Sequence, residues 1–146
     1  MEFQTEAQKG IYEKVAPMIR EIFGEFAQAR DDIPQFGVLM GSSVTRITVV
    51  PWGDDNATIS VCSYVVSGAE ITSDLMSYLL RENATMRFGA FGIDSDEDIQ
   101  FEHTIVGSTC DKEELKASAM AVVRVADKYD DEIVARFGGT RATDQK

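Results

Sequence analysis

Three aspartates at alternating positions, Asp94, Asp96 and Asp98, have the spacing that most resembles a metal site. The same alternation opens a calcium-binding loop, which also needs glycine at its sixth position and glutamate at its twelfth. Those positions hold Ile99 and Ile105, which instead fit the alternation of a strand. We therefore expect a solvated acidic hairpin turn and assign no metal ligand. Weak binding of a divalent metal, as in an acidic-loop regulatory domain, stays open as an alternative.

His103 is the only histidine in the chain. A zinc site would need further ligands at suitable spacing, and none lies on the same stretch. A catalytic triad would need a nucleophile and an orienting acid, and Glu102 points to the opposite face of the expected strand. We therefore expect a half-buried sheet histidine and assign no catalytic residue. The alternative is an enzyme, or a small-ligand-binding domain, that uses His103.

The run Phe-Gly-Ala-Phe-Gly at residues 88–92 is rich in glycine but lacks the features of a phosphate-binding loop. It has no Gly-Lys-Ser/Thr ending, and no helix follows it directly. Glycine inside a strand indicates either a close approach of another backbone or a strand that meets a partner. The sequence leaves both interpretations open, and we assign no cofactor.

The two cysteines are expected to be free thiols in a reducing cytoplasm. Cys62 lies within an expected strand, and Cys110 lies just before an expected helix. A helix N-terminus can lower the pKa of a thiol, but Asp111, Glu113 and Glu114 oppose formation of the thiolate with their negative charge. Both cysteines are therefore interpreted as structural.

The formal net charge of the 146-residue chain is −11, and its sequence pI is about 4.4. Such a surface repels nucleic acid and anionic membranes, and no run of Lys or Arg offsets this repulsion. No segment approaches the roughly 20 apolar residues of a membrane span, and no secretory signal is recognisable. These features favour a cytoplasmic protein with a solvated surface, and the charge leaves open attraction to a basic segment of a partner.

Apolar periodicity predicts three helices. The first covers residues 5–29, with Thr5 and Gln8 as a capping box and a kink or break near Ala16 because Pro17 removes a backbone donor. The second covers residues 70–82. The third follows the Asp111–Glu114 capping box and stops at Gly138–Gly139.

Five strands are expected between these helices, at residues 36–40, 44–50, 57–66, 86–93 and 99–106. The order is α-βββ-α-ββ-α, and the short connections favour antiparallel neighbours. The sequence therefore predicts an α+β fold in which helices flank an antiparallel five-stranded sheet. We expect one domain over residues 1–139 and a flexible polar tail over residues 140–146.

This order of elements resembles the type III secretion chaperone-like (CesT-like) fold, which includes the YbjN family. The local likeness starts with Leu-Leu-Arg-Glu-Asn at residues 79–83 and the strand Met-Arg-Phe-Gly-Ala-Phe-Gly-Ile at 86–93. An acidic turn, the strand 99–106 and a helix opened by Asp-Lys-Glu-Glu-Leu at 111–115 follow. Family members often show a helix ending in Leu-Leu-x-x-Asn, a strand like Phe-Gly-x-x-Gly and a helix starting near Asp-x-x-Glu-Leu. The topology covers nearly the whole chain, and the motifs cover about a third of it.

The resemblance implies a non-enzymatic protein- or peptide-binding adaptor of chaperone type. Chaperones of this fold are small acidic homodimers that hold an extended segment of a client along apolar grooves. Their second helix and the strand beside it contribute to dimerisation. Carried over to this sequence, the resemblance gives a set of protein-binding or dimer residues: Leu75, Tyr78, Leu79, Phe88 and Phe91.

Overall fold

The computed structural model describes residues 1–144, and its first helix, α1 (Glu6–Phe23), is shorter than predicted. The hydroxyl of Thr5 accepts the backbone N–H of Gln8 at 3.0 Å, as the capping pattern predicts. The helix is not interrupted at Pro17, which is exposed. The carbonyl that loses its partner there belongs to Glu13, one turn earlier and also exposed, so water can bond to it.

The chain leaves α1 at Gly24, whose positive φ of 55° favours glycine. A short 3₁₀ turn (Gly24–Phe26) and the strand β1 (Ala27–Ala29) follow. The sequence assigned these residues to the helix because Phe26 continues the helical spacing of apolar positions. A strand of three residues has too little alternation to be recognised against that pattern.

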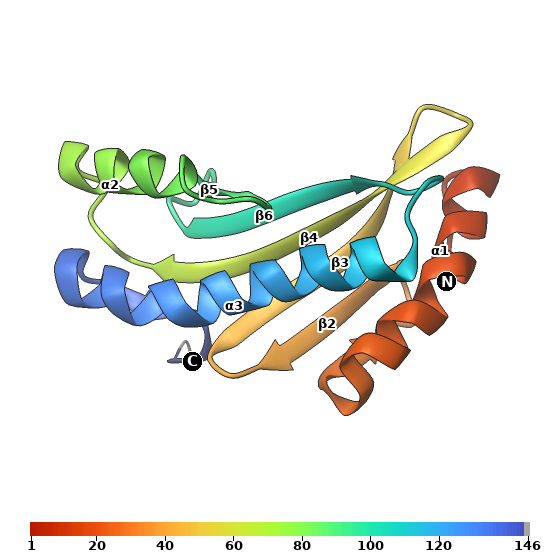
Figure 1. Cartoon of the computed structure of the whole chain (residues 1–146), viewed down its shortest axis with the longest axis horizontal. Coiled ribbons are helices and arrows are strands. Elements are labelled where there is room, and N and C mark those ends of the chain that lie inside the picture. The colour runs from red at the N-terminus through yellow and green to blue at the C-terminus, as the bar shows by residue number, and fades with distance from the viewer. Residues whose placement is uncertain (145–146) are drawn as a thin grey trace.

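One antiparallel sheet forms the centre of the molecule (Figure 1). Its order is β1-β2-β3-β4-β6-β5, so β1 and β5 are the two edges. The main strands are β2 (Gln35–Met40), β3 (Ser43–Trp52), β4 (Asn56–Ser67), β5 (Ala90–Ile93) and β6 (Ile99–Val106). The predicted α+β fold with an antiparallel sheet is confirmed.

The sheet has seven strands among the described residues, two more than predicted. The two additional strands are β1 and β7 (Thr140–Arg141). β7 pairs with the end of β4 and is followed by the 3₁₀ turn Ala142–Asp144. The sequence predicts a flexible tail from residue 140, whereas residues 140–144 are held against the domain. The rest of that predicted tail, residues 145–146, lies outside the described residues.

Helices α1 and α3 (Lys112–Phe137) pack on the same face of the sheet, and α2 (Ser73–Asn83) lies beside the β5 edge (Figure 1). Asp111 caps α3 by accepting the N–H of Glu114 at 2.7 Å, which confirms the predicted start. Thr72 caps α2 in the same way by accepting the N–H of Leu75 at 3.1 Å.

Strand alternation divides the sheet into a buried face and an open face. The side chains under α1 and α3 form one core, whose largest members include Phe36, Ile47, Ile59, Phe101 and Leu115. On the opposite face, the intervening side chains of β2, β3, β4 and β6 are exposed or half-buried. This side of the sheet is therefore accessible over most of its described length.

The predicted strand 86–93 is reduced to β5, because the chain reaches the sheet only at Ala90. Gly89 precedes it with a φ of 83°. A side chain there would start 2.8 Å from the backbone oxygen of Glu102 and 2.6 Å from the ring of Phe101. The close backbone approach that glycine in this run can indicate is therefore present, and no larger residue fits.

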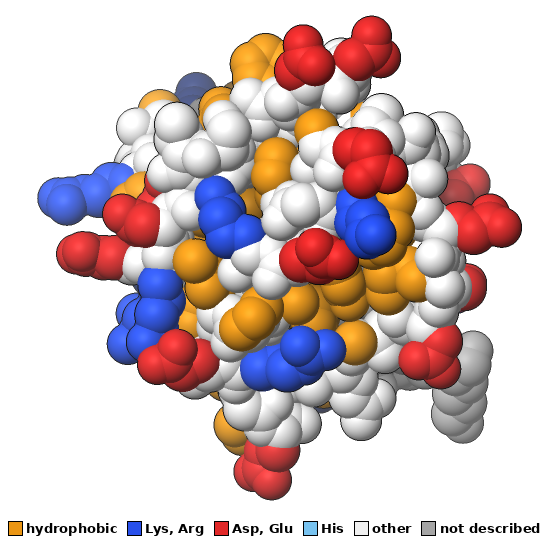
Figure 2. Space-filling view, turned by 90° about the vertical axis from the view of Figure 1, so that its right-hand side faces the viewer, with side chains coloured by type: hydrophobic (Ala, Val, Ile, Leu, Met, Phe, Trp, Pro, Cys, Tyr) orange, Lys and Arg blue, Asp and Glu red, His pale blue; other side chains and the backbone are white. Residues whose placement is uncertain are grey.

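Charges of both signs are mixed on the end of the molecule at which α1 lies. In Figure 2, hydrophobic side chains gather near the centre of this face, with acidic and basic side chains around them. The net charge of −11 therefore does not make this face uniformly negative. An interspersed surface of this kind favours solubility without a long-range field of one sign.

Candidate functional site

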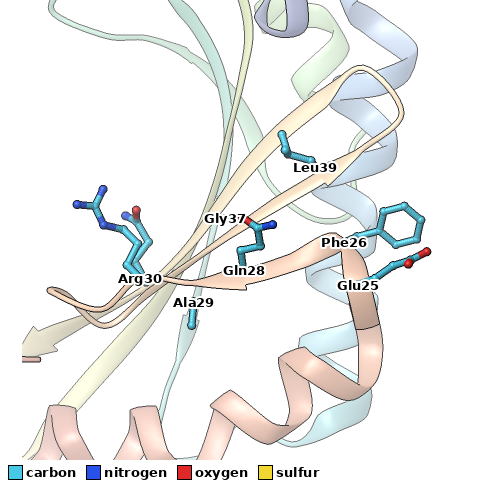
Figure 3. A pocket seen from close by; sticks show the side chains of 8 residues that line it. Glu25, Phe26, Gln28, Ala29, Arg30, Gly37 and Leu39 are labelled. Atoms are coloured by element: carbon cyan, nitrogen blue, oxygen red, sulfur yellow. The ribbon is translucent and has the colours of Figure 1, made fainter.

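A groove of about 610 Å³ lies at the β1 edge of the sheet (Figure 3). It is called the β1 groove below. Its lining comes from the 3₁₀ turn, from β1 with the residue that follows it, and from β2: Glu25, Phe26, Gln28, Ala29, Arg30, Gln35, Gly37 and Leu39.

Two large apolar side chains dominate the β1 groove. Phe26 is 46% exposed and Leu39 is 59% exposed. Gly37 provides a flat floor, since the position of a side chain on it has no other atom within 4 Å. Apolar side chains around an empty floor can receive a side chain from a partner.

The groove exists because β1 is short and lies at an edge. β1 pairs only with β2, in the register Ala27 with Val38 and Ala29 with Phe36. Its other side presents backbone N–H and C=O groups that no strand of the described chain pairs. An edge of this kind can bond to the backbone of an added extended segment, while neighbouring pockets take its side chains.

Polar groups mark the ends of the groove. The carboxylate of Glu25 lies at one end and the guanidinium of Arg30 at the other (Figure 3). Arg30 donates two hydrogen bonds to Asp32, at 2.8 and 2.7 Å, and these bonds lower the pKa of Asp32 to about 2. This pair is exposed, so its contribution to stability is small.

Next to the groove, the open sheet face carries a stacked cation. The guanidinium of Arg46 lies 4.7 Å from the ring centre of Tyr64. Arg46 is exposed, faces Gly37 across the β2–β3 ladder, and has no ion pair within the described residues. Cys62 pairs with Arg46 on the other side and is half-buried. Burial, followed by the charge of Glu102, raises the pKa of the Cys62 thiol to about 11.

A second apolar surface lies at the opposite edge, between α2 and β5. Met76, Leu80 and Ile93 are exposed there and are called the α2–β5 patch below. They surround a depression of about 230 Å³, beneath which Leu79 and Phe91 are buried. Leu80 is 70% exposed, the largest exposure of any large apolar side chain in the described chain.

The side chain of Asn83 holds this second edge to α2. Its amide nitrogen donates to the backbone oxygen of Phe91 at 3.2 Å, and its oxygen accepts the Phe91 N–H at 2.6 Å. These bonds take up part of the backbone edge of β5 in the way that a neighbouring strand would. The asparagine that ends the Leu-Leu-Arg-Glu-Asn motif therefore has a structural role.

The five residues assigned by resemblance fall into two groups. Leu75, Leu79 and Phe91 lie in the core of the protomer itself. Tyr78 is half-buried against the ring of Phe137, and Phe88 is exposed and meets the ring of His103 edge-on. Sequence reasoning missed the exposed apolar residues beside them, which are Met76, Leu80 and Ile93.

The acidic turn brings its three aspartates together. One oxygen from each of Asp94, Asp96 and Asp98 lies within 4.8 Å of the others. Asp94 Oδ1 accepts the backbone N–H groups of Asp96 and Asp98, each at 2.9 Å, so turn formation explains this arrangement. Ile99 and Ile105, which replace the glycine and glutamate of a calcium loop, are buried in the core.

His103 lies on the helix-covered side of β6, half-buried under the ring of Phe88 at 5.8 Å between ring centres. This confirms the predicted sheet histidine. Cys110 is buried, and burial, followed by the charge of Glu114, raises the pKa of its thiol to about 11. The sequence predicts the opposing effect of charge, and the structure adds burial as the larger cause.

Comparison with known proteins places the chain in a family. The model of the TY-Chap1 family, described as T3SS (YopN, CesT) and YbjN peptide-binding chaperone 1, matches residues 11–145. The chain therefore belongs to this family of peptide-binding chaperones, as the resemblance predicts. No curated protein sequence matches the chain significantly.

A solved structure has the same fold. The crystal structure of the ExsC–ExsE complex contains a chain that superposes with a TM-score of 0.58 at 12% identity, over 90% of this chain and 96% of that one. At this level of identity the likeness concerns the fold. No helix within residues 1–144 combines the length and the apolar character needed to cross a membrane.

Proposed function

We propose that this protein is a non-enzymatic chaperone or adaptor that holds an extended segment of a client protein in the β1 groove. The observation that carries the proposal is the pair Phe26 and Leu39, which stand exposed around the flat floor at Gly37. The unpaired edge of β1 lies beside them. An extended segment would bond to this edge and insert an apolar side chain over Gly37.

The family supports a peptide as the ligand, since its members are peptide-binding chaperones. The solved neighbour is a complex of two proteins, ExsC and ExsE, and we carry the idea of a protein partner over to this chain. The mixed lining of the groove, with Glu25, Gln28, Arg30 and Gln35 around two apolar residues, suits a partner that binds and leaves. Transient interfaces are smaller and more polar than permanent ones.

The α2–β5 patch supports a homodimer. Met76, Leu80 and Ile93 form one apolar surface at an edge of the sheet, well separated from the β1 groove in the sheet order. A twofold axis would place the same patch of a second copy against it, as most homodimers require. Tyr78 and Phe88 would lie beside this interface, with Leu75, Leu79 and Phe91 supporting it from beneath. We place the dimer in the cytoplasm, because both cysteines are free thiols.

The test compares what three forms of the tagged protein capture from native lysate, by quantitative mass spectrometry. We expect the wild type to retain a stoichiometric client and Leu39→Asp to lose most of it, because a carboxylate cannot be left unpaired under an apolar side chain. Val50→Asp is the matched control, since Val50 is an exposed apolar residue on the same open face outside the groove. Equal recovery of the client by wild type and Leu39→Asp would refute the groove as its site.

A further inference from the structure

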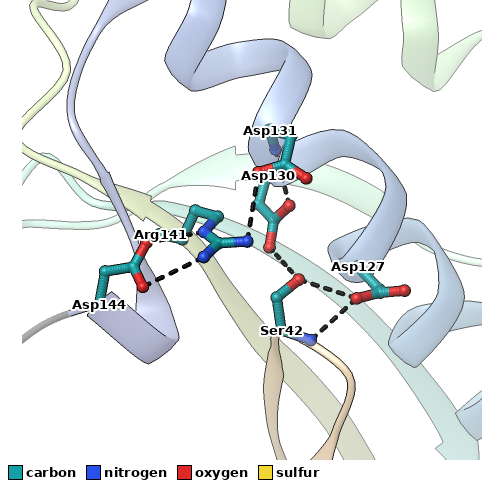
Figure 4. Close-up of polar contacts among 6 residues, drawn as sticks. All are labelled: Ser42, Asp127, Asp130, Asp131, Arg141 and Asp144. Carbon is teal, nitrogen blue, oxygen red and sulfur yellow. Dashed lines mark hydrogen bonds and ion pairs between the residues drawn. The ribbon is translucent and has the colours of Figure 1, made fainter.

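The turn between β2 and β3 is fastened directly to α3 (Figure 4). The backbone N–H of Ser42 donates to Asp127 Oδ1 at 2.8 Å. The hydroxyl oxygen of Ser42 lies 2.8 Å from the same carboxylate oxygen and 2.5 Å from Asp130 Oδ2. Gly41 beside it has a φ of 61°, and a side chain there would start 2.5 Å from Asp127 Oδ1. The turn therefore rests on the helix without space between them.

The number of protons in this contact is limited. The hydroxyl of Ser42 has one proton and touches two carboxyl groups. If Asp127 and Asp130 were both ionised, one of the two oxygen–oxygen contacts would contain no proton and would be repulsive. A second proton, held by one of the carboxyl groups, satisfies both contacts.

The surroundings decide which carboxyl group holds it. Asp130 is 1% exposed, and its burial raises the pKa of its carboxyl group, whereas the two hydrogen bonds from Ser42 lower the pKa of the exposed Asp127. The neighbouring cation is Arg141, whose hydrogen bonds go to Asp144 and Asp131 (Figure 4). No direct bond from Arg141 to Asp130 occurs within the described chain, so the buried carboxyl group is the one that gains from protonation.

Other charged groups face Asp130 from each element around it. Asp127 and Asp131 lie on α3, Arg141 on β7 and Asp144 in the turn that follows β7. The N–H of Asp131 donates to Asp130 Oδ1 at 2.6 Å, which leaves Oδ2 as the oxygen that meets Ser42. Three exposed carboxylates against one guanidinium make ionisation of the buried Asp130 unfavourable.

We propose that Ser42, Asp127 and Asp130 form a proton-dependent latch, in which protonated Asp130 donates to Ser42, Ser42 donates to Asp127, and loss of the Asp130 proton to solvent loosens the β2–β3 turn. The latch also bears on the client site, and this part rests on the proposed function. β2 carries Gly37 and Leu39, so a loosened turn reaches the floor of the β1 groove. Acid tightens the groove and rising pH relaxes it.

The direction follows from linkage between proton binding and opening of the turn. In the open turn the Asp130 carboxyl group has an ordinary pKa of about 3.9. In the closed turn the pKa is raised. The latch is therefore fully formed below about pH 3.9, and opening increases about tenfold per pH unit from there up to the raised pKa, above which it levels off.

Amide hydrogen exchange tests the latch without any ligand. We expect the protection factor of the Ser42 amide, corrected for intrinsic exchange, to fall about tenfold per pH unit from roughly pH 4 up to the raised pKa of Asp130. The protected amides of residues 36–39 should follow with a smaller slope, while Val61 in the core reports global opening. A protection factor at Ser42 that is flat with pH, or that falls in parallel with that of Val61, would overturn the proposal.

Two variants distinguish the effect of the Asp130 proton from the effect of side-chain packing. Asp130→Asn keeps a side-chain donor for Ser42 and removes the titrating group, so the Ser42 protection should become independent of pH. Asp131→Asn removes one of the negative charges that raise the pKa of Asp130, so the fall in protection should persist but should level off at a lower pH than in the wild type. A slope that persists in Asp130→Asn contradicts the latch, as does a carbon-13 titration in which the wild-type Asp130 carboxyl group has an ordinary pKa. Because no client is used, these results are independent of whether the β1 groove binds one.

Discussion

The β5 edge and the β1 edge of the sheet both expose apolar side chains, but in different settings. At the β5 edge, Met76, Leu80 and Ile93 lie over a layer of buried aromatic rings in which Phe91 contacts Phe101 and Tyr129. At the β1 edge, Phe26 and Leu39 stand among glutamine and charged side chains over a bare glycine. The first surface is apolar and firmly supported, and the second is mixed and hollow.

The difference also extends to the backbone. Asn83 bonds to the N–H and C=O of Phe91, so part of the β5 edge is already occupied. At β1 the backbone N–H of Ala27 already donates to the Gly24 carbonyl, and no strand or side-chain amide of the described residues pairs with the rest of the outer edge. The apolar surface at the β5 edge suits a permanent interface with a second subunit. The edge of β1, beside a groove, suits an extended segment that binds and dissociates. We therefore propose that dimerisation uses the β5 edge and that client binding uses the β1 edge.

The largest effect is expected from Phe91→Asp, beneath the α2–β5 patch. Phe91 is buried between Phe101 and Tyr129, with ring centres 5.0 and 5.3 Å away. A carboxylate there loses the packing and buries a charge, so we expect a loss of about 4 kcal/mol or more in the free energy of unfolding. Urea unfolding followed by circular dichroism measures it. If Phe91→Asp unfolded at the same urea concentration as the wild type, Phe91 would not support this edge.

Leu80→Asp should instead leave the protomer folded and separate the dimer. Because Leu80 is 70% exposed, the substitution should change the stability of the protomer by less than about 0.5 kcal/mol. Two carboxylates facing each other across a twofold axis should weaken dimerisation at least about a hundredfold. Light scattering over a concentration series measures this effect. If Leu80→Asp dimerised as tightly as the wild type, or if the wild type were monomeric at every concentration, the α2–β5 patch would not be a dimer interface.

Gly37→Val tests whether the client binds over Gly37 in the β1 groove. A Cβ atom at this position meets no other atom within 4 Å, and valine suits a strand, so β2 should gain about 0.5–1 kcal/mol of stability. The same side chain fills the floor of the groove and should reduce client recovery at least about tenfold. Capture and thermal unfolding are measured on one preparation. A stabilised variant that still recovers its client would place the client elsewhere.

The smallest effect concerns the cysteines on the two sides of the sheet. Their thiol pKa of about 11 leaves roughly one thiolate in a thousand at pH 8, so both should react slowly with iodoacetamide, and faster as pH rises. Cys62, half-buried on the open face near the β1 groove, should react before the buried Cys110. Mass spectrometry of the labelled protein reports the order. Faster labelling of Cys110 than of Cys62 would contradict the conclusion that the face of the sheet carrying Cys62 is the accessible one.

The sequence predicts the fold well where its signals are local. Hydroxyl and carboxyl caps at Thr5 and Asp111 mark two helix starts, and alternation of β-branched residues marks β3 and β4. The strand β1 could not be predicted, because its few residues directly follow a helix whose apolar spacing Phe26 continues. The β1 groove depends on that strand, so the groove was missed with it.

The proposed dimer surface, the α2–β5 patch, was missed for a different reason. On α2, Leu75, Tyr78 and Leu79 have the spacing of a buried stripe, and Leu75 and Leu79 are buried in the protomer. Met76 and Leu80 follow one position later and would count as equally good core residues by sequence. They are exposed only because no other described element covers that side of α2. Exposure of an apolar residue depends on the tertiary arrangement, which periodicity does not contain.

The central claim is that the two edges act independently, and light scattering on affinity-captured complexes tests it most directly. We expect the wild-type eluate to have the mass of a dimer plus client, Leu39→Asp the mass of a dimer alone, and Leu80→Asp the mass of a monomer that still carries client. If Leu39→Asp dissociated the dimer, or if Leu80→Asp lost the client while remaining dimeric, the assignment of the two edges would be contradicted.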